Sequence, residues 1–182
     1  KKYHFVTAIE SDTIYLFTGK RYENEKATAI IKEETETWIA NCKKNDPQEV
    51  EAKIKRKTYK NLQDFDSDPN LINCENGILD LRTMEKKDHT HTYLSKVLIP
   101  CNFTMPKSQD IEINLEKTLF WKYLKNSFTV DGKLNQNDMM NVLEIMSSVF
   151  LKRNVDEKSI MFLGTGENGK SVCLDYTKYM TG

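Results

Sequence analysis

The residues of this sequence that could do chemistry most directly lie near its carboxyl end, where GTGENGKS occupies residues 164–171. The spacing satisfies GxxxxGK[ST], a pattern in which backbone amides surround the phosphates of a nucleotide. We expect this loop to bind ATP, with the Lys170 ammonium on the β- and γ-phosphates and the Ser171 hydroxyl on Mg²⁺. The predicted nucleotide-binding residues are Gly164, Thr165, Gly166, Glu167, Asn168, Gly169, Lys170 and Ser171.

The sequence on either side of the loop supplies the setting that phosphate binding needs. The apolar run Ile160 to Leu163 predicts a strand before the loop, and Val172, Cys173 and Tyr176 begin the apolar face of a helix after it. Such a helix adds its positive N-terminal end to the site. The simpler alternative is a glycine turn without a ligand, which would make both the lysine and the hydroxyl coincidences.

Hydrolysis of ATP would need more than this loop, namely a Walker B acid for magnesium and groups that orient water and stabilise charge. Such groups normally follow the loop, and only residues 172–182 do so here. We therefore expect no catalytic residue in this chain. Because it also begins with Lys1 rather than Met, we interpret it as a fragment of a longer enzyme, inactive in hydrolysis by itself.

A second group of suggestive residues is the basic run KIKRKTYK at 53–60, which surrounds Tyr59. Cations beside an aromatic ring suit contact with phosphates and stacking on a base, so the run is a candidate nucleic-acid site. The alternative is a solvated helix face whose cations pair with Glu49 and Glu51 at helical spacing. The candidate nucleic-acid residues are Lys53, Lys55, Arg56, Lys57 and Lys60.

Composition argues against several other classes of protein. The 27 lysines and arginines equal the 27 aspartates and glutamates, so no overall charge attracts nucleic acid or an anionic membrane. Four cysteines without a CxxC pair, and His89 and His91 in a polar loop, favour buried thiols and surface histidines over a metal site. No apolar run approaches the roughly 20 residues that span a bilayer. We expect a soluble, cytoplasmic protein.

The elements that must position these groups begin with short strands and tight turns over residues 5–22, where aromatic and β-branched residues alternate. Apolar periodicity predicts a helix from Asn24 to Cys42. A second helix opens at Asp46-Pro47 and runs to about Tyr59. Trp38 and Trp121 are interpreted as core anchors rather than platforms for bases.

An Asn76-Gly77 turn joins two apolar stretches in LINCENGILDLR and predicts a β-hairpin. This turn places Cys74 opposite Leu79 and Asn73 opposite Asp80, so that apolar side chains gather on one face. Asn73 and Asp80 are then expected to serve turn and surface roles rather than catalysis.

The remaining elements are a strand over residues 93–103 and two helices, over about residues 111–123 and 139–150, with Asn135 or Asn137 as a cap. The charged linker 152–158 marks the domain boundary. The predicted fold is α+β: a helix-rich domain with β-hairpins over residues 1–152, then the first strand, P-loop and helix of an α/β P-loop NTPase core over residues 158–182.

The order of hairpin, strand, two helices and FLGTGENGKS resembles the superfamily 3 helicases of the poxvirus and phage or plasmid primase-helicase type. The resemblance is carried by LINCENGILDLRT, YLSKVLIPCNF and the Asn168 to Ser171 ending. It implies a helix-rich domain that helps to assemble a hexameric ring, followed by an AAA+ ATPase that translocates on DNA. Gly164, Gly169, Lys170 and Ser171 match its Walker A positions. The implied partners are further copies of the chain, DNA and, in many relatives, a primase domain.

The sequence is therefore compatible with three functions. The first is a fragment of a replicative helicase that binds Mg-ATP. The second is a non-enzymatic collar that oligomerises or binds DNA, with an incidental P-loop. The third is a P-loop NTPase unrelated to DNA, such as a kinase. The long region before the loop argues against this third function.

Overall fold

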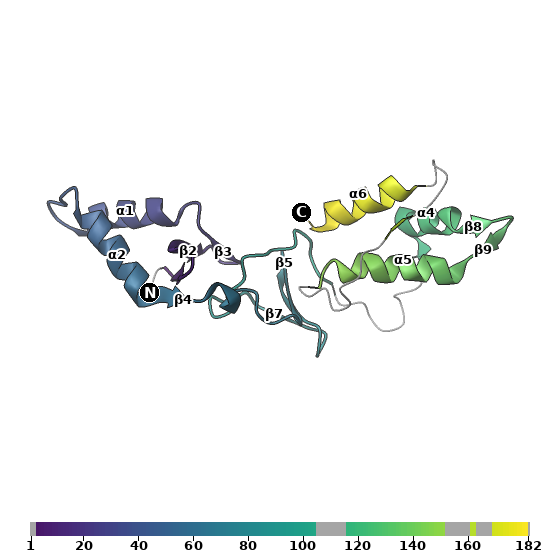
Figure 1. Ribbon diagram of the computed structural model, residues 1–182, viewed down its shortest axis with the longest axis horizontal. Helices are drawn as coiled ribbons and strands as arrows, with labels where there is room; N and C mark the ends of the chain where they lie inside the picture. The colour runs from purple at the N-terminus through teal and green to yellow at the C-terminus, as the bar shows by residue number, and fades with distance from the viewer. Residues whose placement is uncertain (1–2, 105–115, 152–160, 163–168, 182) are drawn as a thin grey trace.

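The computed structural model describes residues 3–104, 116–151, 161–162 and 169–181. Within these ranges the protein is a mixed α+β structure with five α-helices and three small sheets. Figure 1 shows three groups of elements along the longest axis: a sheet with two helices, a smaller middle sheet, and a helical group at the carboxyl end. The predicted helical residues 111–115, the predicted boundary at 152–158 and the loop residues 164–168 lie outside the described residues.

The first sheet confirms the strands predicted over residues 5–22. It contains β1 (Phe5–Ala8), β2 (Thr13–Phe17), β3 (Tyr22–Glu23) and β4 (Tyr59–Lys60), in the order β3-β2-β1-β4. β1 and β2 are antiparallel, whereas β4 pairs parallel with β1, with Ala8 opposite Lys60. The sheet thereby fixes the end of the basic run beside the amino-terminal strand.

Two helices pack on one face of this sheet, α1 (Ala27–Trp38) and α2 (Asp46–Thr58). Ile14 and Leu16 of β2 form a buried cluster with Ala27 and Ile31 of α1, because these residues lie one helical turn apart on the same face. Both predicted helices are confirmed. α1 is shorter than predicted, and α2 begins at the predicted Asp46-Pro47 pair.

The interpretation of Trp38 as a core anchor is wrong. Trp38 is the last residue of α1 and is 78% exposed. Its indole Nε1 donates a hydrogen bond to the Glu34 carboxylate at 2.8 Å, one turn back along the helix. The helix therefore ends with this ring outside the buried stripe, and the polar edge of the indole is satisfied on the surface.

The middle sheet contains β5 (Leu71–Cys74), β6 (Gly77–Asp80) and β7 (Glu85–Lys87), in that order. The predicted hairpin is confirmed, and so is its apolar face, because Ile72, Cys74 and Leu79 share one buried cluster. The predicted pairing is wrong. Cys74 pairs with Gly77 rather than Leu79, and Asn73 pairs with Ile78 rather than Asp80.

The physical reason for the changed pairing lies at Gly77. The turn consists of Glu75 and Asn76, and Gly77 already belongs to β6, with a φ of 142°. A Cβ at this position would lie 2.6 Å from the carbonyl oxygen of Lys87 in β7. The glycine is thus required for the close approach of a third strand, not for the turn itself.

The strand predicted over residues 93–103 is not formed. The amide of Ser95 donates to the carbonyl of Tyr93, and that of Cys101 to the carbonyl of Ile99, each at 2.8 Å. These local bonds occupy groups that a ladder would use. The segment meets the sheet through an isolated parallel bridge between Cys74 and Ile99.

The carboxyl-terminal group contains α4 (Leu119–Ser127), β8 (Thr129–Val130), β9 (Lys133–Leu134), α5 (Gln136–Ser148) and α6 (Lys170–Thr181). Its buried core unites Leu124 of α4, Met139 and Met146 of α5, and Cys173 of α6. Of the two predicted caps, Asn135 and Asn137, it is Asn135 that caps α5, because its side chain accepts a hydrogen bond from the backbone amide of Asp138. The core fixes α6, and with it the end of the predicted nucleotide-binding loop, against α4 and α5.

No helix among the described residues is long and apolar enough to cross a membrane.

Candidate functional site

The predicted nucleotide site is represented by its last three residues. Gly169 precedes α6, and Lys170 and Ser171 form the first turn of that helix, which confirms the helix predicted after the loop. Residues 164–168 lie outside the described residues, and Met161 and Phe162 of the predicted strand have no strand conformation. The amides of a first helical turn lack partners within the helix, so this end of α6 favours an anion.

Gly169 is held in a conformation that favours glycine. Its φ is 75°, and a Cβ would lie 2.9 Å from the ring of Tyr123 in α4. The Tyr123 hydroxyl donates a hydrogen bond to the Gly169 carbonyl at 2.6 Å, and the Cys173 amide donates to the same oxygen at 3.1 Å. Burial raises the pKa of Tyr123, which keeps its hydroxyl protonated as a donor. This contact between α4 and Gly169 joins residues 46 positions apart and could not be predicted from local sequence patterns.

The side chain of Lys170 lines a cavity of about 380 Å³ between α4, α5 and α6. Tyr123 of α4, Asp138 of α5 and Phe162 line the same cavity. A cation, a carboxylate and aromatic rings thus line one cavity beside the end of the predicted nucleotide-binding loop. Cavities of this volume accept small organic ligands.

The predicted nucleic-acid residues lie on α2 and β4, and the structure divides them into two sets. Lys55 is half-buried and ion-paired with Asp12 at 2.7 Å and Glu51 at 3.5 Å, as the solvated-face interpretation expected for this spacing. Tyr59 also turns to Asp12, with its hydroxyl 2.9 Å from the carboxylate. Arg56 lines a hollow with Asp46 and Glu49, and Lys53 lines this hollow as well as the groove described next. These residues are balanced by acidic neighbours.

Lys53, Lys57 and Lys60 form the other set, which lines an open groove of about 800 Å³. We call this the basic groove and define it by Lys53, Lys57, Lys60, Tyr3, His4 and His91. Among the described residues that line it, none is acidic. The imidazoles of His4 and His91 stack with centroids 3.6 Å apart and planes 16° apart. Sequence patterns did not predict that β1 and the loop that carries His91 would lie beside the lysines of the basic run.

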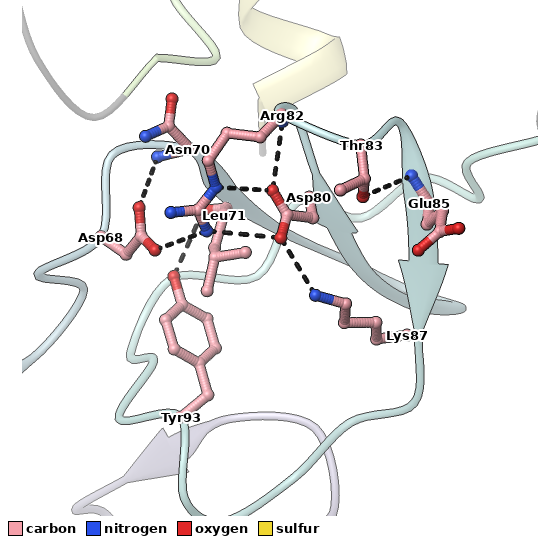
Figure 2. Close-up of polar contacts among 9 residues, drawn as sticks. All are labelled: Asp68, Asn70, Leu71, Asp80, Arg82, Thr83, Glu85, Lys87 and Tyr93. Carbon is pink, nitrogen blue, oxygen red and sulfur yellow. Dashed lines mark hydrogen bonds and ion pairs between the residues drawn. The ribbon is translucent and has the colours of Figure 1, made fainter.

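The middle sheet also contains a cluster of ion pairs that sequence patterns did not predict. The expectation that Asn73 and Asp80 serve turn and surface roles is wrong. Both are buried, at 2% and 4% exposure. Arg82 donates to Asp80 from Nε at 2.9 Å and to Asp68 from Nη2 at 2.8 Å, and Lys87 donates to Asp80 at 3.0 Å (Figure 2). Hydrogen bonds from Arg82 and then Lys87 hold the pKa of Asp80 well below its usual range.

This cluster is structural in character. Its cations satisfy the Asp80 carboxylate, and the neighbouring Tyr93 hydroxyl donates to the Leu71 carbonyl at 3.2 Å (Figure 2). The side-chain Nδ2 of Asn73 likewise donates to the carbonyls of Lys20 and Val97, at 3.0 and 3.1 Å. These buried polar groups join the middle sheet to the segments around it rather than facing a cavity.

We find no metal site and no activated thiol in the part of the chain that the structure describes. No group of three His, Cys, Asp or Glu side chains there could hold a metal ion. His89 bonds the Cys74 carbonyl at 2.9 Å, and His91 stacks on His4. Burial raises the pKa of the Cys74 thiol to about 11, which makes it a poor nucleophile.

Comparison with known proteins gives one family match. The protein family described as D5 N terminal like matches residues 1–129 of the 182. This domain is found in poxvirus D5-type and phage or plasmid primase-helicases. No curated protein matches the chain. The matched range contains both larger sheets, the basic groove and Tyr123, and it ends before the P-loop.

Proposed function

The chain belongs to the D5 N terminal like family, and on this basis we propose that it is part of a replicative DNA helicase of the superfamily 3 type. Residues 164–171 bind Mg-ATP, and the complete protein uses ATP to separate DNA strands as a hexameric ring. The observation that carries the proposal is a D5 N terminal like domain in one chain with a GxxxxGK[ST] sequence whose lysine opens a helix.

The chemistry of the loop end supports nucleotide binding. Lys170 and Ser171 lie at the positive end of α6, where backbone amides and a lysine ammonium together favour phosphate oxygens. Magnesium would be bound through the Ser171 hydroxyl and the phosphates of the nucleotide. The Lys170 cavity, with Tyr123 and Phe162, offers apolar surface beside this position.

The proposal assigns different tasks to the two parts of the chain. The P-loop supplies ATP binding, whereas the D5 N terminal like domain precedes the motor and takes part in ring assembly and contact with DNA. A primase domain or other replication proteins are proposed as further partners of the complete protein. The nucleic-acid role gains a specific observation of its own, the basic groove.

Magnesium dependence tests the proposal. We expect a fluorescent ATP analogue to bind the chain in the presence of Mg²⁺ and to lose most of its affinity when EDTA is added. In Ser171→Ala the affinity with Mg²⁺ should fall towards the EDTA value, because the hydroxyl ligand is gone. Equal binding with Mg²⁺ and EDTA in the parent chain would contradict the proposed site.

A further inference from the structure

We propose that the basic groove binds a single-stranded polynucleotide, at a site separate from the P-loop. The groove lies in the amino-terminal part of the chain, between α2, β1 and the loop that carries His91. Its ligand is identified by two kinds of group on one surface: lysines for phosphates and flat rings for bases. The inference does not depend on nucleotide binding by residues 164–171.

The lysines of the groove come from the last turns of α2 and from the strand that follows it. Lys53 and Lys57 are one turn apart on α2, a rise of about 6 Å, and Lys60 follows in β4 after the helix ends. All three are exposed. In contrast to Lys55, they form no ion pair within the part of the chain that the structure describes. Their charge is therefore available to a ligand.

Two acids near this surface accept hydrogen bonds from side chains of the protein. Asp12 is engaged by Lys55 and Tyr59, and Glu34, which accepts from the Tyr3 hydroxyl at 2.7 Å, lines a different hollow. The net charge of the whole chain is zero, yet the described lining of the groove carries lysines and histidines without a carboxylate. A local positive surface of this kind attracts an anionic chain.

The stacked imidazoles of His4 and His91, which we call the ring wall, offer flat surfaces that suit nucleobases. His4 and His91 stack face to face, and His91 is exposed to solvent. Stacking of bases on flat side chains is tolerant of sequence, because every base has a π-face. A partner that supplied negative charge alone would leave these rings unused, so the combination favours a polynucleotide over an acidic peptide.

The two ring-bearing segments are held in place before any ligand arrives. The Phe17 amide donates to the His4 carbonyl at 3.0 Å, and the Tyr22 hydroxyl donates to the His91 carbonyl at 2.7 Å. Tyr22 is itself buried, with 3% exposure. A preformed wall lowers the ordering cost of binding.

The stacked rings of the groove favour a single strand over a duplex. Stacking on the rings requires bases whose faces are open, and bases inside a duplex stack on one another instead. Its volume of about 800 Å³ is in the range that encloses ligands of small-molecule size. An extended strand can place a base in such a space and continue its backbone past the lysines.

The test measures binding of a fluorescein-labelled oligothymidylate to the full 182-residue chain without ATP. Fluorescence anisotropy gives the affinity at several salt concentrations. The groove variant carries Lys53→Gln, Lys57→Gln and Lys60→Gln. The matched control carries Lys26→Gln, Lys32→Gln and Lys44→Gln, three exposed lysines outside the groove with the same loss of charge. His91→Ala tests the ring wall separately, and circular dichroism checks that every variant is folded.

We expect the groove variant to lower the salt slope by about 2, since each phosphate contact contributes about 0.7 in single strands. Between 50 and 200 mM salt, the affinity of the parent should then fall about 20-fold more than that of the groove variant. The control should keep the parent slope. His91→Ala should weaken binding severalfold at an unchanged slope.

Three results would overturn the inference: equal loss of affinity in the groove variant and the control, equal affinity for a duplex of the same length, or equal competition by polyglutamate. None of these readouts involves ATP. A result that contradicts polynucleotide binding by the groove therefore leaves the proposed ATP binding intact, and a result that contradicts ATP binding leaves the groove proposal intact.

Discussion

The hydroxyl of Tyr123 donates a 2.6 Å hydrogen bond to the carbonyl of Gly169, and so links α4 to the final glycine of the proposed P-loop. The two residues are 46 positions apart in sequence. The same tyrosine ring occupies the space in which a Cβ of residue 169 would lie. The contact joins the helical part of the chain to the residue that precedes Lys170.

Loss of this hydroxyl should have a measurable cost. Tyr123→Phe keeps the ring but removes the donor, and we expect the free energy of unfolding to fall by about 1 kcal/mol. Tyr176→Phe is the matched control, because Tyr176 stacks on Phe120 in the same core and its hydroxyl has no hydrogen bond among the described residues. Urea denaturation of the two variants makes the comparison, and equal stability would argue against the Tyr123 bond.

Gly169→Ala should be more costly than an ordinary glycine substitution at positive φ. Gly132 has the same φ of 75° with open space around it, so Gly132→Ala measures the backbone cost alone, about 1–2 kcal/mol. Gly169→Ala adds a clash with the Tyr123 ring. Urea denaturation should therefore show a larger loss at 169 than at 132, and the excess should disappear when both glycine variants are compared in a Tyr123→Ala background. An excess that survives there would assign the clash to another neighbour.

The ion pairs of the middle sheet predict a loss of stability in acid. The pKa of Asp80 is lowered in the folded protein, chiefly by the hydrogen bonds from Arg82, so its ionised form stabilises the fold. This contribution is present above the unfolded pKa of about 4 and is lost as pH falls towards the lower folded pKa.

Asp80→Asn should therefore be less stable than the parent at pH 7, and the difference should shrink as the pH falls below about 4. Asp88→Asn is the control, because Asp88 is exposed and forms no ion pair among the described residues. Thermal unfolding followed by circular dichroism between pH 7 and pH 2 gives both values. A difference between Asp80→Asn and the parent that stays constant over this range would contradict the role of the charge.

Local signals in the sequence predicted the elements well. Pro47 fixes the start of α2, Asn135 caps α5, and the alternation of residues 5–22 predicts the first sheet, because each signal acts through bonds within a few residues. The apolar face of the 71–82 hairpin also followed from its pattern. These features need no knowledge of the rest of the chain.

Errors arose where distant residues decide the outcome. The turn was placed at Asn76-Gly77, whereas Gly77 is required inside β6 by the approach of Lys87. Trp38 lies beyond the buried stripe of α1, which amphipathic spacing alone does not reveal. The same limit applies to function: the basic run was visible in the sequence, but not the meeting of its lysines with His4 and His91.

Isothermal titration of Mg-ATP into the full chain measures whether the proposed P-loop binds a nucleoside triphosphate. Lys170→Ala is compared with Lys178→Ala, which removes an exposed lysine from the same helix. We expect a single-site isotherm in the parent and in Lys178→Ala, and at least a tenfold loss of affinity in Lys170→Ala. Equal affinity in all three proteins, or no heat of binding in the parent, would contradict the proposed nucleotide binding.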